Sequence, residues 1–296
     1  MGMTMFGKNL IRMFKFDLKT HHKAVREFQK FPMMLDNLKY EIADEIKSLK
    51  LPKVLDQFAS VQAILDSNKS VSRFGDGEFN LILGNSIGFQ EYDPELSRRL
   101  KEVLMTKDEG MLIGISRRFG TLADVDAQVR AYWRWFMAQH RDAIYQMLDF
   151  DRTYIDTCMT AHSIEVDDHT TDDCREDTER YYNLVRQIWD GKDITVIKGE
   201  GTENFKYDIY DNARSVSYIY GPKEHAFREY DRILAEAEKL PKDRLIIAVL
   251  GPTATVLAYD LHQKGYRVLD IGHMGKAYEW LKTHDKKIVA GQFFAA

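Results

Sequence analysis

Leu245-Ile246-Ile247-Ala248-Val249-Leu250 is an unbroken apolar run, and Gly251-Pro252-Thr253 follows it directly. A short apolar run with no polar side predicts a strand that helices cover on both faces, as in a parallel sheet. Proline suits the first turn of a helix and glycine suits its end, so we expect a helix through His262 that closes at Gly265. The next strand is predicted over residues 266–271.

The same alternation of strand and helix extends back to Ser70. Short β-branched runs, most of them followed by a helical pattern, occupy residues 71–74, 111–115, 194–197, 216–220 and 267–271. Strands that alternate with helices imply βαβ units, so we predict an α/β fold with a mostly parallel sheet and helices on both faces. In such sheets, ligands bind outside the carboxyl ends of the strands.

Residues 1–67 look helical and predict an N-terminal extension, which leaves residues 68–296 as the α/β domain. Phe31-Pro32 and Leu51-Pro52 interrupt the extension, because proline disfavours helix at the residue before it. Within residues 1–30, basic side chains mix with apolar ones near helical spacing. Such a helix can lie on an anionic membrane surface, or pack on the body or on a second subunit of a homodimer. Both interpretations stay open.

The composition is that of a soluble globular protein, with 44% hydrophobic and 30% charged residues. There is no apolar run of about 18 residues and no secretory signal pattern. We therefore expect a cytoplasmic protein, at the inner membrane face if the N-terminal helix binds lipid. Cys158 and Cys174 have no spacing typical of a disulfide framework or a zinc site. A net charge of −4 argues against a nucleic-acid partner, because proteins that bind nucleic acids normally have a strong basic excess or a basic stripe.

The segment Arg73-Phe74-Gly75-Asp76-Gly77-Glu78-Phe79 contains two carboxylates on either side of a glycine. Mg²⁺ or Mn²⁺ needs only one or two protein carboxylates when substrate phosphates and water complete its shell. Gly75 and Gly77 allow the backbone to approach a ligand, and Arg73 offers a planar donor fork to a diphosphate. The segment therefore predicts a metal and phosphate site. The alternative is a solvated Asp-Gly turn.

Three other features have two interpretations each. The helix that begins near Thr253 can bind an anion through its free N–H groups and the Thr253 and Thr255 hydroxyls, or those hydroxyls can simply cap it. Residues 151–180 look like a long loop whose acids and histidines either bind a metal or, as we expect, face water. The aromatic group Tyr132, Trp133, Trp135 and Phe136 is expected in the core of a long helix, with a sugar platform as the alternative.

Taken together, several segments resemble the bacterial GT-D-type glycosyltransferases. The resemblance rests on Arg73 to Gln90, on Gly251-Pro252-Thr253-Ala254 and on Asp270-Ile271-Gly272-His273, in that order along the chain. It covers residues 70–281. It implies a Rossmann-like fold and a DxE motif that binds Mn²⁺ or Mg²⁺.

The resemblance also implies roles for individual residues. Asp76 and Glu78 become the catalytic, metal-binding DxE carboxylates. The implied donor-binding residues are Arg73, Gly75, Gly77, Asn85, Thr202, Gly251, Pro252, Thr253, Ala254, Asp270 and Gly272. The chain departs from the family pattern at Thr255, where a lysine is common, at Ala277, where an acid is common, and in residues 198–203. The catalytic base must then lie elsewhere, and the candidates are Glu200, Asp208 and His273. Capping or structural roles are the alternatives for these three.

The function implied is a metal-dependent glycosyltransferase that moves a hexose from a nucleotide sugar, expected to be UDP-linked, to a glycan or lipid-linked glycan acceptor. The product belongs to bacterial surface polysaccharide or glycoprotein biosynthesis. Two alternatives remain. One is a metal-dependent phosphohydrolase in which the clusters around Asp76 and His162 activate water. The other is a catalytically degenerate nucleotide-binding module, suggested by the missing acid at Ala277.

Overall fold

The computed structural model describes residues 20–34, 37–38, 49–122, 127–161, 172–202 and 205–283. The chain forms two compact units, Met1–Lys50 and Leu51–Ala296. In the first unit, residues 20–34 are helical, and Phe28, Phe31 and Met34 are exposed. Most of the predicted basic helix over residues 1–30 lies outside the described residues. None of the described helices is long and apolar enough to span a bilayer.

The second unit is built on an eight-stranded sheet whose paired strands are all parallel. The strand order is β1-β4-β3-β2-β8-β7-β5-β6. The strands are β1 (Lys53–Val54), β2 (Ser70–Phe74), β3 (Met111–Ile115), β4 (Thr153–Asp156), β5 (Asp193–Gly199), β6 (Ser215–Gly221), β7 (Leu245–Val249) and β8 (Val268–Asp270). The predicted α/β class and parallel sheet are confirmed.

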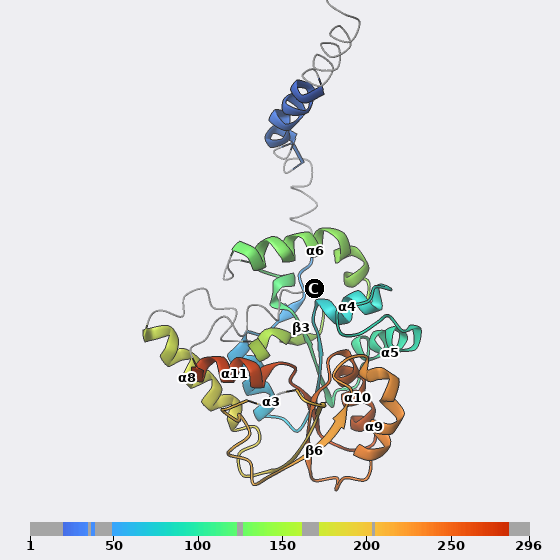
Figure 1. Cartoon of the computed structure of the whole chain (residues 1–296), viewed down its shortest axis with the longest axis vertical. Helices are drawn as coiled ribbons and strands as arrows, with labels where there is room; N and C mark the ends of the chain where they lie inside the picture. The colour runs from blue at the N-terminus through green and yellow to red at the C-terminus, as the bar shows by residue number, and fades with distance from the viewer. Residues whose placement is uncertain are drawn as a thin grey trace, which may run out of the picture. The chain divides into compact units, whose positions relative to one another are not determined.

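Helices cover both faces of this sheet (Figure 1). One core lies under α5 (Pro94–Leu104), α9 (Tyr230–Ala237) and α10 (Pro252–Gln263), and the other lies under α3 (Gln57–Leu65), α8 (Asp172–Arg186) and α11 (Met274–Thr283). Two further helices, α4 (Asp76–Ile82) and α6 (Ala127–Tyr145), lie beyond the carboxyl end of β2. Short 3-10 turns occupy η1 (Arg117–Phe119), η2 (Thr157–Ala161) and η3 (Ala226–Glu229).

The connection from β7 to α10 forms as its sequence predicts. Ile246 and Ile247 are fully buried, as expected of a strand covered on both faces. Gly251 turns the chain with φ of +54°, and a Cβ at this position would lie 2.7 Å from the Phe89 ring. Glycine is therefore required here for conformation and for space. Gly265, with φ of +84°, follows the end of α10.

The start of the α/β unit differs from the predicted boundary at residue 67. The unit begins at Leu51, because β1 pairs in parallel with β4 and α3 packs against the same core as α8 and α11. A strand of two residues has no readable periodicity, which explains why the pattern of residues 51–67 looked only helical.

The predicted long loop over residues 151–180 is wrong for its described parts, because β4, η2 and the first half of α8 occupy them. β4 is only four residues long, too short for a clear alternation. α8 is strongly polar, yet Thr178, Tyr181 and Val185 are buried on one side of it. The acidic and histidine residues of 162–171 lie outside the described residues, so their predicted solvation stays a prediction.

Candidate functional site

The predicted site residues gather at the carboxyl edge of the sheet. Arg73 is the residue before the last in β2, Asp270 ends β8, Gly251 follows β7 and Glu200 follows β5. The chain leaves β5 outward to β6 but leaves β7 inward to β8. The carboxyl ends of β5 and β7 therefore flank a topological switch point, which is where ligands bind in open parallel sheets.

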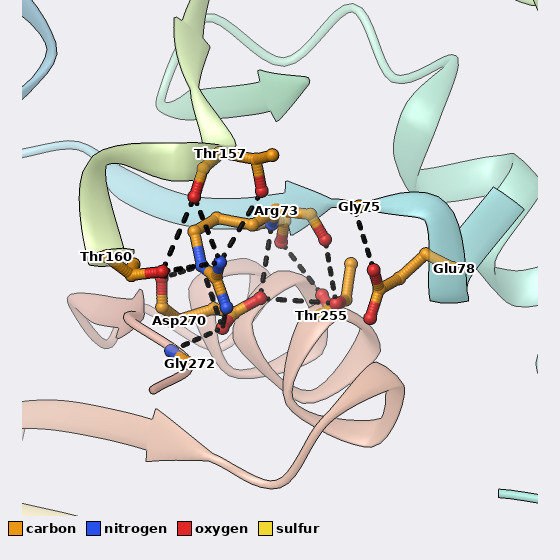
Figure 2. Close-up of polar contacts among 9 residues, drawn as sticks. Arg73, Gly75, Glu78, Thr157, Thr160, Thr255, Asp270 and Gly272 are labelled. Atoms are coloured by element: carbon orange, nitrogen blue, oxygen red, sulfur yellow. Dashed lines mark hydrogen bonds and ion pairs between the residues drawn. The ribbon is translucent and has the colours of Figure 1, made fainter. Parts of the chain in front are cut away.

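A buried ion pair between Arg73 and Asp270 lies at the centre of this edge (Figure 2). The Arg73 Nη2 atom lies 3.0 Å from Asp270 Oδ1, and Arg73 Nε donates to the Asp270 carbonyl oxygen at 3.0 Å. Arg73 Nη1 donates to the Thr157 carbonyl oxygen at 3.2 Å and to Thr160 Oγ1 at 3.3 Å. Thr255 Oγ1 donates to Asp270 Oδ2 at 3.2 Å. The network thus joins β2, β8, η2 and α10.

This network gives the Arg73 guanidinium protein partners on all three nitrogens. Its predicted binding of a diphosphate stays a prediction, and its described contacts are structural. Gly272 allows the turn after β8 to lie close to the Arg73 guanidinium. Its φ is +48°, and a Cβ there would lie 2.0 Å from Arg73 Nη2. The amide of Gly272 also donates to Asp270 Oδ1 at 3.3 Å.

The two DxE carboxylates occupy the first turn of α4 and have different partners. Glu78 Oε2 accepts the Gly75 amide hydrogen bond at 2.8 Å, which closes the helix start (Figure 2). Asp76 Oδ2 accepts a short hydrogen bond from the Tyr132 hydroxyl of α6. Residues two apart on a helix do not face each other, which explains why the carboxylates diverge.

Loss of water around Glu78, together with the negative charge of Asp270, raises the pKa of the Glu78 carboxyl to about 7. The positive charge of Arg73 and the Gly75 amide oppose this shift without cancelling it. We call the Glu78 and Asp270 carboxylates at the end of β2 the acidic corner. At neutral pH this acidic corner therefore holds more negative charge than Arg73 neutralises.

The described residues contain no group of three or more His, Cys, Asp or Glu side chains arranged to hold a metal ion. Two carboxylates are nevertheless sufficient for a hydrated Mg²⁺ or Mn²⁺ that also binds a diphosphate. The raised pKa of Glu78 fits such an ion, because a cation beside the carboxylate favours its ionised form. Asp76 and Glu78 thus fit the predicted metal as a partial ligand set.

The start of α10 is not capped by its own side chains. Gly251 occupies the cap position and offers none. The Thr255 hydroxyl donates to the Arg73 carbonyl oxygen and to Asp270. Thr253 Oγ1 is buried and makes no hydrogen bond to the described residues. The capping alternative for Thr253 and Thr255 is therefore wrong.

The three candidate bases lie in different surroundings. Asp208 Oδ1 accepts the Tyr210 amide hydrogen bond at 2.9 Å, a local turn contact. Glu200 is exposed in the turn after β5, and Thr202, in the same turn, donates to the Gly199 carbonyl oxygen at 2.7 Å. Loss of water around the ring and the cations of Lys276 and Arg73 lower the pKa of His273. The lowered pKa keeps the His273 ring neutral at pH 7.

Asn85 is exposed in the loop after α4, outside the network of Figure 2. Two residues that contact the site, Thr157 and Thr160, were not predicted, because they follow a strand that was itself not predicted. Tyr132 was named only within an aromatic group and Thr255 only for its hydroxyl at a helix start. Their contacts with Asp76 and Asp270 were not predicted.

Comparison with known proteins agrees with this geometry. The family model described as "Glycosyltransferase GT-D fold" matches residues 71–294. The "Probable glycosyl transferase Gly" of Streptococcus gordonii is 36% identical over 77% of this chain, and "Glycosyltransferase GlyD" of Streptococcus pneumoniae serotype 4 is 30% identical over 81%. The chain spans only 33% and 29% of these two relatives.

Solved structures are also similar. One, described as "The highly conserved domain of unknown function 1792 has a distinct glycosyltransferase fold", has a TM-score of 0.74 and 32% identity, and covers 79% of this chain and 83% of its own. Another, "A New Glycosyltransferase (DUF1792) from Streptococcus sanguinis", has a TM-score of 0.72 and 31% identity. The match covers 79% of this chain and 85% of the other chain. The chain therefore belongs to the GT-D glycosyltransferase family.

Proposed function

We propose that this chain transfers a hexose from a nucleotide diphosphate sugar, UDP-linked, to a glycan acceptor, and that the reaction depends on Mn²⁺ or Mg²⁺. The observation that carries the proposal is the acidic corner at the end of β2. There, Glu78 has a pKa of about 7 beside Asp270, in a chain of a glycosyltransferase family. A divalent cation beside these carboxylates would favour their ionised form.

Asp76 and Glu78 are the residues that would hold the metal. A divalent cation supplies a Lewis acid that neutralises the charge growing on a departing diphosphate. The Arg73–Asp270 ion pair links β2 to β8 at their carboxyl ends, next to the start of α4. The N-terminus of α10, where the Thr253 hydroxyl makes no hydrogen bond to the described residues, is suited to the diphosphate itself.

Activation of the acceptor hydroxyl requires a proton acceptor on the sugar side of the diphosphate. Glu200, Asp208 and His273 remain the candidates. The lowered pKa of His273 makes its ring a weak proton acceptor. Asp208 already accepts a backbone hydrogen bond. Glu200 is exposed and is our first choice.

The acceptor and its setting rest on the family alone. We propose a glycan or lipid-linked glycan of bacterial surface polysaccharide or glycoprotein biosynthesis, modified on the cytoplasmic side. Contact of the N-terminal helix with the membrane surface, and a homodimer, remain part of the proposal.

Calorimetry with UDP, UDP-glucose, UDP-galactose and UDP-N-acetylglucosamine, with and without Mn²⁺, tests the metal site. We expect Asp76→Asn and Glu78→Gln to weaken Mn²⁺-dependent binding at least about tenfold, because each removes an ionised ligand. Glu102→Gln, an exposed acid on α5, is the matched control and should bind like wild type.

Unchanged binding in both site variants would remove the metal from the proposal. Release of phosphate or sugar phosphate without any acceptor would favour the phosphohydrolase instead. Nucleotide binding without turnover on a broad panel of acceptors would favour the degenerate module.

A further inference from the structure

Helix α6 distributes its aromatic side chains between the core and the surface. Trp133 and Phe136 are buried, as predicted. Trp135 is 55% exposed. Tyr132 lies between the two groups, with its ring centroid 6.1 Å from Trp135 and 6.2 Å from Phe136. One face of α6 therefore presents a large exposed indole beside a half-buried phenol.

Edge-to-face contacts hold this helix against α4. The Phe119 ring lies 5.4 Å from Phe79 and 5.8 Å from Trp133. The Tyr132 hydroxyl donates to Asp76. The aromatic surface of α6 is thus continuous with one of the two DxE carboxylates, and its position is fixed by core packing.

The two carboxylates point to different sides of the first turn of α4. Glu78 contacts Gly75 and senses the charge of Asp270, on the side of β8. Asp76 contacts Tyr132, on the side of α6. If the metal and the donor diphosphate lie between the first turn of α4 and the start of α10, then the surface of α6 beyond Asp76 is left for a second substrate.

We infer that Trp135 and Tyr132 form the binding surface for the acceptor sugar. This inference rests on the proposed function and names the place of its second substrate. An exposed aromatic ring offers a large rigid apolar surface to the C–H face of a pyranose, and adjacent carboxylates and phenols accept or donate hydrogen bonds to its hydroxyls. Donor sugars are anchored by their nucleotide, whereas an acceptor needs such a surface of its own.

A second exposed aromatic pair serves as a comparison. Tyr218 and Tyr220 stack at 5.9 Å on the edge strand β6 and are 39% and 47% exposed. Four strand spacings, about 19 Å, separate β6 from β2 in the sheet. This pair has no contact with the DxE carboxylates among the described residues.

Saturation-transfer NMR with the methyl glycosides of glucose, galactose and N-acetylglucosamine, in the absence of donor, tests the inference. We expect at least one glycoside to bind wild type, Trp135→Ala to weaken that binding about tenfold, and Trp135→Phe to restore part of it. Tyr220→Ala, with a similarly exposed ring, should bind like wild type. Thermal melting of each variant checks that it is folded.

Binding of UDP with Mn²⁺ is measured on the same samples, which separates the two claims. Trp135→Ala should keep wild-type affinity for UDP and Mn²⁺. Glycoside binding that is equal in wild type and Trp135→Ala, or absent from wild type, would overturn the acceptor surface. If wild type shows no metal-dependent binding of UDP, the proposed function is overturned, even where glycosides bind at Trp135.

Discussion

Glu78 both closes the start of helix α4 and has a carboxyl group with a raised pKa. Its carboxylate closes the first turn of α4 through the Gly75 amide, and the same position exposes it to the charge of Asp270. A helix start alone would favour an ionised acid. The raised pKa shows that desolvation and the neighbouring carboxylate outweigh this effect.

This pKa shift predicts a pH dependence of stability in the protein without metal. The folded state binds the Glu78 proton more tightly than the unfolded state, whose pKa is near 4.5, so stability decreases as pH rises from about 4.5 through about 7. Glu78→Gln cannot ionise. We expect the free energy of unfolding of Glu78→Gln, measured relative to wild type, to be higher at pH 8 than at pH 4 by about 3 kcal/mol.

Urea unfolding at the two pH values measures this difference. Glu95→Gln, which alters an exposed acid on α5, is the control and should show no such gain at pH 8. A constant difference between Glu78→Gln and wild type at both pH values would contradict the assigned pKa.

At the scale of elements, the site depends on a close contact between the carboxyl ends of the neighbouring strands β2 and β8. Gly272 follows β8 and faces the Arg73 guanidinium at the end of β2. The sequence predicted both strands and placed Gly272 in the donor site. It did not indicate that this glycine is required by an arginine almost 200 residues away, because no local pattern records a long-range close approach.

Gly272→Ala should therefore destabilise the fold by about 3 kcal/mol, since a Cβ there would lie 2.0 Å from Arg73 Nη2 and must displace the ion pair with Asp270. Gly191→Ala is the matched control. Its φ is +63°, but a Cβ there meets nothing within 4 Å, so only the backbone strain of about 1 kcal/mol applies. Equal losses of unfolding free energy in Gly272→Ala and Gly191→Ala, measured by chemical denaturation, would mean that the Arg73–Asp270 ion pair does not require a glycine at position 272.

The elements that sequence reasoning found and missed differ in a physical way. β7 and α10 were predicted because an unbroken apolar run and a Gly-Pro junction are both local signals. β4 and α8 were missed because β4 is four residues long and α8 has a polar composition, so burial of Tyr181 and Val185 appears only after the chain has folded. The Tyr132–Asp76 contact was missed for the same reason.

At the scale of the whole molecule, the order of the strands brings together segments from the full length of the α/β unit. Asp76 follows β2, the α6 aromatics follow β3, Gly251 follows β7 and Asp270 ends β8. Chain order alone suggested that these motifs meet at one edge. The side of α4 on which each carboxylate lies depends on packing, which no local sequence pattern records.

The central claim is that Asp76 and Glu78 hold a cation that also binds the diphosphate of a nucleotide sugar. A crystal structure with UDP and Mn²⁺, with anomalous diffraction data recorded at the manganese edge, tests it most directly. We predict one manganese peak within coordination distance, about 2.2 Å, of a carboxylate oxygen of Asp76, of one of Glu78 and of a diphosphate oxygen. A diphosphate bound without manganese at α4, with Asp76 still on Tyr132 and Glu78 still on Gly75, would contradict the claim.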